Sequence, residues 1–510
     1  MSGFIFAFFV FYVVMLFVIT GITSRKADNQ TYFTGNRKSP WFVVAYGMIG
    51  SSLSGVTFMS VPGDVYTTQF TYFGVVLGYV LGYIVIGGLL LPLYYKLNVT
   101  SIYEYLGGRF GNEAHKTGSV LFFISRLLGS ALRMYLVIFV LQVFVFDGWH
   151  IPIWLTSIVM ITIILLYTMR GGIKTVVWTD LLQTTFLIGA LVITIVVIMR
   201  NMGGSFTDLW QGMSTAGKGG TDCRTVWNLD WHDNSFFLKQ IIGGMFITIA
   251  MTGLDQDMMQ KNLSCKSLRD ARRNMFSFTS ILVVVNILFL TLGGMLLVFA
   301  QRNGIDISQM PTDRIYPEIA FNYLGKAGAM VFVFGLISAG FSSADGTFTA
   351  LTTTVCYDIL RIERRYPSAT TQLRVRRIVH VLISVLFLMV IIIVSNHHND
   401  ALIRIIFMVA SYTYGPLLGL FMFGIFTKRE VPAHRRWTIP VIAVLVPTFC
   451  YILSSHSQQW LWGYKFGYEL LIVNGLLVFA CLMAVSGKQE TGDLRLKTED
   501  HRPKTIDRKS

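Results

Sequence analysis

The sequence has little charge and few cysteines for its length of 510 residues. Only 14% of the residues are charged, whereas 53% are hydrophobic. So low a charge density excludes an ordinary soluble fold and predicts an all-α polytopic membrane protein. The five cysteines are scattered and form no CxxC pair, so we predict neither disulfides nor a metal centre.

The chain also lacks the residue sets expected of an enzyme or a channel. It has no HExxH motif, and most of its nine histidines fall in predicted loops. No repeated segment resembles a selectivity filter, and the longest outer segments, about 200–236 and 301–327, are too short for a separate receptor or catalytic domain. A membrane-embedded enzyme or a channel is therefore a disfavoured alternative, and we expect the chain to act within the membrane without covalent chemistry.

What the sequence does contain is long apolar runs. A membrane-spanning helix needs about 20 apolar residues, and thirteen stretches qualify. Because the first one has no basic start and no small-residue cleavage site, it is predicted to be a retained helix. The predicted spans are residues 3–22, 41–62, 72–95, 118–146, 151–169, 177–199, 237–257, 275–300, 328–356, 378–395, 401–426, 437–455 and 466–486.

The basic residues predict the orientation of these spans. Most of the 42 Lys and Arg residues fall in alternate loops and in the tail after residue 486. The positive-inside rule places those segments in the cytoplasm, with the amino terminus outside and the carboxyl terminus inside. The net charge of +15 is then explained by topology and lipid contact, with no nucleic-acid partner. We expect one transmembrane domain, residues 1–486, and a cytoplasmic polar tail, residues 487–510.

The second predicted span contains a candidate helix break. Its sequence YGMIGSSLSGVTFMSVPGDVY places Gly50, Gly55 and several serines near mid-membrane. Glycines weaken a helix there, and serines can receive the freed backbone groups, which is how transporters build discontinuous helices that bind ions. The alternative is a small-residue packing face.

The seventh predicted span, IIGGMFITIAMTGLDQDMM, has the same character, with Gly243, Gly244, Thr248, Thr252 and Gly253. Spans two and seven are five apart and enter the membrane from opposite sides. This predicts a 5+5 inverted repeat, about residues 41–199 and 237–426.

The ninth predicted span carries hydroxyls on one face. Ala339, Ser342, Ser343 and Gly346 are three or four residues apart and share that face. Small neutral oxygen ligands suit a weakly bound alkali cation, although the same residues could simply allow close helix packing.

Three arginines and one aspartate are predicted within or beside spans. Arg126 and Arg133, seven residues apart on span four, lie about 12 Å and about 22 Å from the cytoplasmic edge. A buried arginine needs a partner, so Arg133 is predicted to bind a substrate carboxylate or else an internal partner, and Arg126 to form an internal ion pair. Arg404 is read as a snorkelling residue, and Asp180 could be an ordinary helix-start carboxylate.

Several sequence blocks, in this order, resemble the sodium:solute symporters, which share the leucine-transporter fold. The resemblance covers about residues 1–486. The blocks are SSLSGVTF, GGIKTVVWTD, TGLDQDMMQKNL followed by KSLRDARR, LISAGFSSADGTFTAL, and SYTYGPLLGLFMFGIF.

The resemblance implies a sodium site made of backbone carbonyls in the broken helix and of one carbonyl and two hydroxyls opposite. At matching positions these are Gly50, Leu53, Ala339, Ser342 and Ser343. Sodium is the only metal ion implied, as the coupling ion.

Some family members have a second sodium site, which uses the aspartate matching Asp180 and hydroxyls one turn beyond the serine pair. This sequence has Asp345 and Gly346 at those positions. One sodium ion is therefore expected, with Asp180 and Asp345 as candidates for a second ion or an ion exit. Asp345 could itself bind sodium or a proton.

For the substrate, Ser52, Ser54, Thr57 and Arg133 are similar to the pattern of the sialic-acid branch, where an arginine and hydroxyls take the carboxylate. We therefore expect an organic anion such as sialic acid or a monocarboxylate. A sugar or amino acid is the alternative within the family. Candidate gating or stacking residues are Tyr79, Tyr83 and Tyr412.

The resulting hypothesis is sodium-coupled import by alternating access, with sodium leaving past Asp180. The expected partners are the solute, sodium and the lipid bilayer. We expect a protein that functions as a monomer in the cell membrane, specifically the bacterial inner membrane.

Overall fold

The computed structural model describes residues 2–25, 27–203, 205–397, 408, 412–464 and 466–487. This part of the chain is helical, and it contains no β-strand, only three isolated bridges such as the one between Ser39 and Cys265. The prediction of an all-α protein is therefore confirmed.

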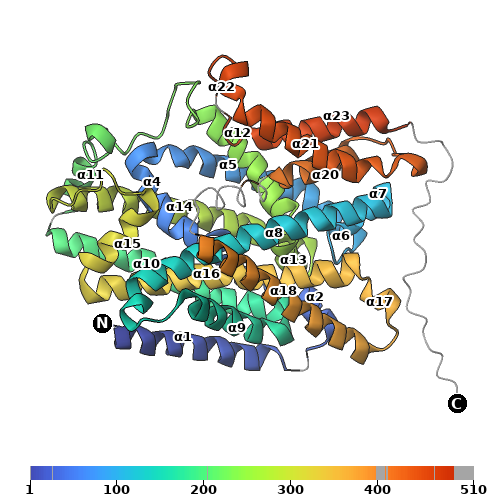
Figure 1. Cartoon of the computed structure of the whole chain (residues 1–510), viewed down its shortest axis with the longest axis horizontal. Helices are drawn as coiled ribbons and strands as arrows, with labels where there is room; N and C mark the ends of the chain where they lie inside the picture. Colours follow the sequence, from blue (N-terminus) through green and yellow to red (C-terminus); the bar gives the residue numbers. More distant parts are fainter. Residues whose placement is uncertain are drawn as a thin grey trace.

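The helices run along most of the described chain (Figure 1). The longer ones in the first half are α1 (Ser2–Thr23), α3 (Trp41–Ser52), α4 (Gly55–Thr68), α5 (Tyr72–Val85), α8 (Asn112–Leu141), α9 (Ile153–Gly171) and α10 (Ile173–Met202). Those in the second half are α12 (Phe237–Thr248), α14 (Leu268–Arg302), α16 (Gly325–Thr354), α18 (Ala369–His397), α20 (Tyr414–Phe426), α21 (Thr438–Ser455) and α23 (Leu470–Val485). Shorter helices connect them: α2 (Asn29–Thr34), α6 (Leu91–Leu97), α7 (Glu104–Phe110), α11 (Phe206–Gly212), α13 (Gln256–Leu263), α15 (Thr312–Asn322), α17 (Ile362–Arg365) and α22 (Ser457–Trp460).

Many of these helices could cross a membrane. Within the described residues, nine helical stretches are long and apolar enough, and a bent pair makes a tenth. Three further apolar helices, α3, α20 and α23, are shorter. A multi-pass membrane protein is confirmed, whereas the number thirteen stays a prediction. Arg404 and the start of the eleventh predicted span lie outside the described residues.

The first predicted break is confirmed. Helix α3 ends at Ser52, Leu53 has an extended backbone with ψ 95°, and α4 begins at Gly55 after its N-cap Ser54. The Ser54 side chain accepts a hydrogen bond from the amide of Thr57, which satisfies one of the free donors of the new helix. The second half of the span continues to Thr68, beyond the predicted end at residue 62.

A second break interrupts the helix that begins at Phe237. Helix α12 passes into a π-helical turn at Ile249–Gly253, and α13 then leaves at an angle of 66°. Asp255 caps α13 by accepting hydrogen bonds from the amides of Asp257 and Met258. Both halves of the chain thus contain a span interrupted in its middle.

Helix α16 lies in the centre of the bundle (Figure 1) and packs along α10, α8 and α4. Nearly all its residues from Gly328 to Thr354 are buried, although they include many hydroxyls. A helix buried all round shows no polar stripe toward solvent, so its polar side chains must find partners inside the protein.

The peripheral helices instead expose apolar side chains. Val14 on α1, Leu382 on α18 and Leu445 on α21 are each more than half exposed. Apolar patches of this extent are typical of a surface covered by lipid chains.

Two boundaries differ from prediction and change the meaning of charged residues. Helix α10 begins at Ile173, so Asp180 lies two turns inside it, and the interpretation as a helix-start residue is wrong. Helix α13 extends to Leu263, so Lys261, which the sequence placed in a cytoplasmic loop, lies on a buried helix. The predicted span stopped at the acidic residues because the apolar run ends there, whereas in the structure these residues are buried inside the protein.

Candidate functional site

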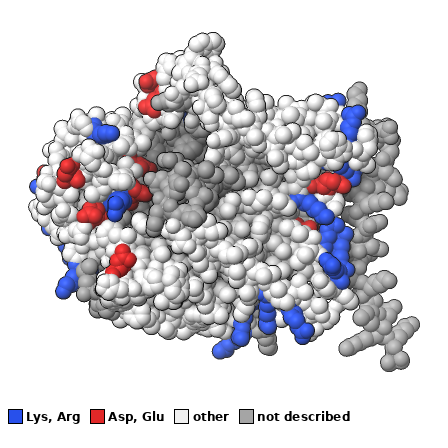
Figure 2. Space-filling view, in the orientation of Figure 1, with Lys and Arg blue, Asp and Glu red and all other residues white. Residues whose placement is uncertain are grey.

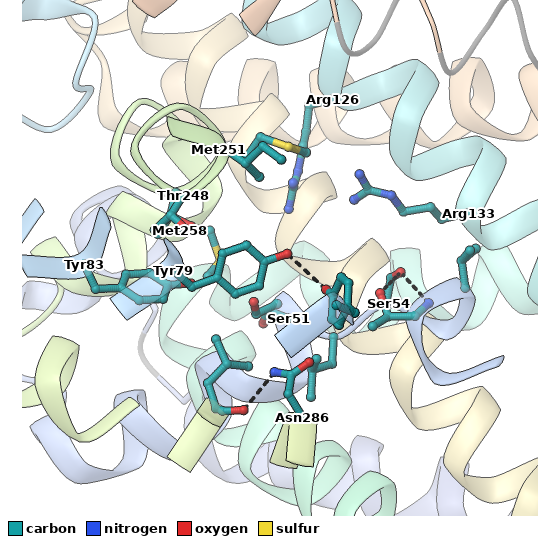
Figure 3. Close-up of a pocket in the computed structure, with 18 residues that line it drawn as sticks. Ser51, Ser54, Tyr79, Tyr83, Arg126, Arg133, Thr248, Met251, Met258 and Asn286 are labelled. Atoms are coloured by element: carbon teal, nitrogen blue, oxygen red, sulfur yellow. Dashed lines mark hydrogen bonds between the residues drawn. The ribbon is translucent and has the colours of Figure 1, made fainter. Parts of the chain in front are cut away.

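A cavity of about 260 Å³ lies where the two broken helices face each other. Its walls come from the α3–α4 break, α5, α8, the α12 break and α14 (Figure 3). All four predicted substrate residues, Ser52, Ser54, Thr57 and Arg133, line this one cavity. They are 81 residues apart at the extremes of the sequence, and the fold brings them together.

The start of α4 presents hydroxyls and a helix N-terminus to the cavity. The Ser54 Oγ and Thr57 Oγ1 atoms are 3.1 Å apart, and both residues line the cavity. The first amides of a helix lack helical partners, and the helix dipole favours negative charge there. This wall can therefore donate hydrogen bonds to an anionic group.

Arg133 lies on the neighbouring wall. It is half-buried on α8, and Figure 3 shows its side chain reaching from α8 toward the middle of the cavity. Among the described residues, no hydrogen bond or ion pair engages its guanidinium group, whose nearest charged neighbour on the helix is Arg126. A guanidinium without a partner in a membrane cavity is suited to a bidentate carboxylate.

Arg126 has the opposite environment. Its guanidinium nitrogens pair with Asp257 and with Asp255, the latter at 3.4 Å. Asp255 also accepts a hydrogen bond of 2.9 Å from the Tyr414 hydroxyl. The predicted internal ion pair of Arg126 is therefore present, and it ties α8 to α13.

The predicted sodium residues lie beside the first break. Gly50 and Leu53 are at the end of α3, where the last carbonyls of a helix lack helical partners. An added Cβ at Gly50 would lie 2.6 Å from Thr184 Oγ1 on α10 and 3.0 Å from Ser342 Oγ on α16, so the glycine lets α3 pack closely against both helices. Ala339, Ser342 and Ser343 are all buried on α16.

The two serines differ in their partners. Ser342 Oγ donates to Asp180 Oδ1 at 2.6 Å and lies 3.3 Å from Ser51 Oγ. Ser343 Oγ is buried and has no hydrogen-bond partner among the described residues. An oxygen in that condition costs free energy unless a ligand reaches it, so Ser343 is the more available of the two for a cation.

Asp180 forms an ion pair that the sequence did not predict. Lys261 Nζ lies 2.8 Å from Asp180 Oδ2 and 3.6 Å from Asp257 Oδ1. It also donates to Ser51 Oγ. Lys261 is only 1% exposed, so an ammonium group occupies the space beside Asp180.

The spacing of Asp257 and Lys261, four residues apart, was the available signal for this cluster. Such a pair shares one helical face. The sequence-based interpretation missed this pair because it treated TGLDQDMMQKNL as the end of a span followed by a loop. Basic residues in such a loop also satisfy the positive-inside rule.

Asp345 and Gly346 occupy separate environments. Asp345 Oδ2 accepts hydrogen bonds from Tyr167, Gln183 and Thr179, whereas a Cβ added at Gly346 would lie 2.4 Å from Asp257 Oδ1. A serine or threonine at position 346 would therefore collide with Asp257. Position 346 has no hydroxyl side chain because Asp257 packs against it and leaves no space for one.

Two of the three predicted gating tyrosines line the cavity. Tyr79 and Tyr83 do so, and the Tyr79 hydroxyl lies 3.0 Å from that of Tyr72. Tyr412 instead packs against Tyr451 and lines a neighbouring, mainly apolar pocket. Asn286, which the sequence did not single out, lies on the opposite side of the main cavity from the arginines (Figure 3).

Comparisons with known proteins agree with this geometry. The sequence matches the sodium:solute symporter family over residues 32–432. The sodium/sialic acid symporter SiaT of Proteus mirabilis is 26% identical over 81% of this chain and 83% of its own length. The sodium/sialic acid symporter NanT of Aliivibrio fischeri is 23% identical over 89% of this chain and 88% of its own length.

The fold is also similar to a solved structure. The substrate-bound, outward-open structure of a sodium-coupled sialic acid symporter superposes with a TM-score of 0.80, over 95% of this chain and 99% of the other, at 22% sequence identity. At that identity the similarity establishes the shared fold.

Proposed function

The chain belongs to the sodium:solute symporter family, and from this premise we propose that it imports an organic carboxylate of the sialic-acid class together with sodium by alternating access. The observation that carries the choice of substrate is the guanidinium of Arg133, which faces the cavity and has no partner among the described residues. The N-terminus of α4, with Ser54 and Thr57, supplies the second contact to an anion.

The rest of the cavity supports a solute with several polar groups. Besides the anion-binding wall, it presents the hydroxyls of Tyr79, Thr248 and Thr252 and the amide of Asn286. The Asn286 Oδ1 atom is buried and has no partner among the described residues, so it can accept a hydrogen bond from the solute. The volume of the cavity lies just below the roughly 300 Å³ at which small-molecule pockets usually begin. The two relatives named above are sialic acid symporters.

We assign the coupling sodium ion to the carbonyls of Gly50, Leu53 and Ala339 and the hydroxyls of Ser342 and Ser343. The close approach of Gly50 to Ser342 and the unpartnered hydroxyl of Ser343 support this assignment. A cation held there would join α3 to α16 and fix the break in the shape that lines the cavity. Sodium binding would therefore favour solute binding.

The proposed orientation has the amino terminus outside, thirteen spans in a 5+5 inverted repeat, and one transmembrane domain. The distribution of charge supports it. Figure 2 shows Lys and Arg gathered at the end of the molecule where α6, α7 and α17 lie, whereas Asp and Glu are concentrated at the opposite end. This asymmetry is typical of a cytoplasmic face and an outer face.

The inner path is proposed to open at α13. In the described structure, Tyr103 donates to the carbonyl of Leu254 at 3.0 Å, and the Gln256 side chain bonds to the backbone of Ile102 and Thr100. These contacts hold the second break against the inner ends of the bundle. Their release, with movement of the α8–α13 ion pairs, would let sodium leave past Asp180.

The test is uptake of radiolabelled sialic acid into proteoliposomes with an inward sodium gradient. Wild-type protein is expected to show sodium-dependent uptake, and Ser343→Ala to lose it because one ion ligand is missing. Thr354→Val is the matched control, since Thr354 is another buried, unpartnered hydroxyl of α16 that lies three turns away. Full sodium dependence in Ser343→Ala would reject the site assignment.

A further inference from the structure

A second polar cluster lies beside the proposed sodium site, between α1, α9, α10 and α16. At its centre is Asp345, which is fully buried. Its Oδ2 atom accepts from the Tyr167 hydroxyl at 2.8 Å, from Gln183 Nε2 at 3.3 Å and from Thr179 at 3.4 Å. Its Oδ1 atom has no partner among the described residues.

Three further oxygens of the cluster lack partners. Gln183 Oε1, the Tyr12 hydroxyl and the Ser338 hydroxyl are buried and make no hydrogen bond to described residues. Tyr12 reaches this place from α1 and lies next to Gln183 and Ser338. Three unpartnered oxygens around one carboxylate are unusual, because buried polar groups nearly always have partners.

The basic side chains near Asp345 form ion pairs with other carboxylates. Arg126 pairs with Asp255 and Asp257, and Lys261 pairs with Asp180. No basic side chain of the described residues lies within ion-pairing distance of Asp345. An ionised carboxylate at this depth is costly unless a positive charge compensates it.

Lys261 also argues against a second sodium ion bound at Asp180. The family resemblance places a second sodium ion beside Asp180, but in this chain an ammonium group already lies there, and Asp257 fills the space next to Gly346. A second free cation at Asp180 would meet a like charge at hydrogen-bonding distance.

We propose that Asp345 Oδ1, Gln183 Oε1 and the Tyr12 hydroxyl oxygen bind a second sodium ion, separate from the Ser342–Ser343 site and from Asp180. One carboxylate with neutral oxygens suits a monovalent cation. The proposal rests on the proposed function and gives it a stoichiometry: two sodium ions and one carboxylate carry one net positive charge inward. The membrane potential then drives accumulation, because each transport cycle moves net positive charge inward.

Equilibrium binding of ²²Na⁺ to the purified full-length protein tests the site directly. The expected counts are two ions for wild type, one for Asp345→Asn, one for Ser343→Ala and two for the control Thr354→Val. Tyr12→Phe should keep the fold and weaken the second binding step roughly tenfold, because one oxygen ligand is lost. Size-exclusion elution identifies any variant that fails to fold.

Two results overturn the proposal. One is a wild-type count of one ion that Asp345→Asn retains, and the other is a count of two in Asp345→Asn. If wild type binds no sodium, the proposed function itself fails, so the two failures are distinguishable. As an independent readout, addition of the carboxylate to wild-type proteoliposomes should produce a current that carries net positive charge into the vesicles. This current should be lost in Asp345→Asn, and an equal current in both proteins contradicts the site.

Discussion

Arg126 and Arg133 lie seven residues apart on α8, and their surroundings give them different roles. Two carboxylates neutralise Arg126, whereas Arg133 faces the cavity without a partner among the described residues. Helical periodicity places both side chains on one face, but only the tertiary structure shows which one is already paired. The sequence predicted an internal ion pair for Arg126, and it left Arg133 open between a substrate carboxylate and an internal partner.

The first prediction concerns Arg133. Replacement by lysine keeps the charge but removes the planar, two-point donor, so Arg133→Lys should raise the KM for the carboxylate roughly 10- to 100-fold. Half-saturating sodium, measured by ²²Na⁺ binding without solute, should stay near the wild-type value, because no proposed sodium ligand is changed. An unaltered KM for the carboxylate would show that Arg133 does not bind it.

Single residues were predicted well where a local pattern carried the information. The hydroxyls of α16 follow helical spacing, and the glycines around Ser52 indicate a break. For Lys261 the local pattern held only its spacing of four from Asp257, because its other partners, Asp180 and Ser51, are 81 and 210 residues distant in sequence. Long-range ion pairs leave no periodic signal in the chain.

At the scale of elements, the two broken helices and α16 form the centre of the molecule. Predicting the first break required only the glycines and serines near residue 53. The second break was located correctly, but its inner half was assigned to a loop because Asp255, Asp257 and Lys261 end the apolar run. The helix persists there because α8, α10 and α20 supply the partners for those charges.

The second prediction tests the packing of α16 on α13. Gly346→Ser should destabilise the protein by about 1–3 kcal/mol, the usual effect of overpacking, because the new Cβ would lie 2.4 Å from Asp257 Oδ1. A thermal melt in detergent should show a lower melting temperature and weaker sodium binding.

Gly189→Ser is the matched control for this substitution. Gly189 lies on α10, and an added Cβ there would meet no atom within 4 Å. Its melting temperature should equal that of wild type. Equal melting temperatures for both variants would mean that α16 and α13 do not pack as closely as described.

At the scale of the whole molecule, composition and loop charge predicted a multi-pass membrane protein, and the apolar surface confirms it. The arrangement that makes the cavity could not be derived from composition, because it depends on α5, α8 and α14 meeting around two breaks. The family resemblance predicted the leucine-transporter fold. The match over residues 32–432 establishes the family, and the superposition on a solved structure establishes the shared fold.

The measurement that tests the central claim most directly is solute accumulation by the purified protein in proteoliposomes. Vesicles would be offered sialic acid, hexoses, amino acids and short carboxylates, each with an inward sodium gradient and with equal sodium on both sides. We predict that sialic acid or a related carboxylate accumulates above its external concentration only when the gradient is present. Accumulation that is equal without the sodium gradient, or that is confined to an uncharged hexose, would contradict the account.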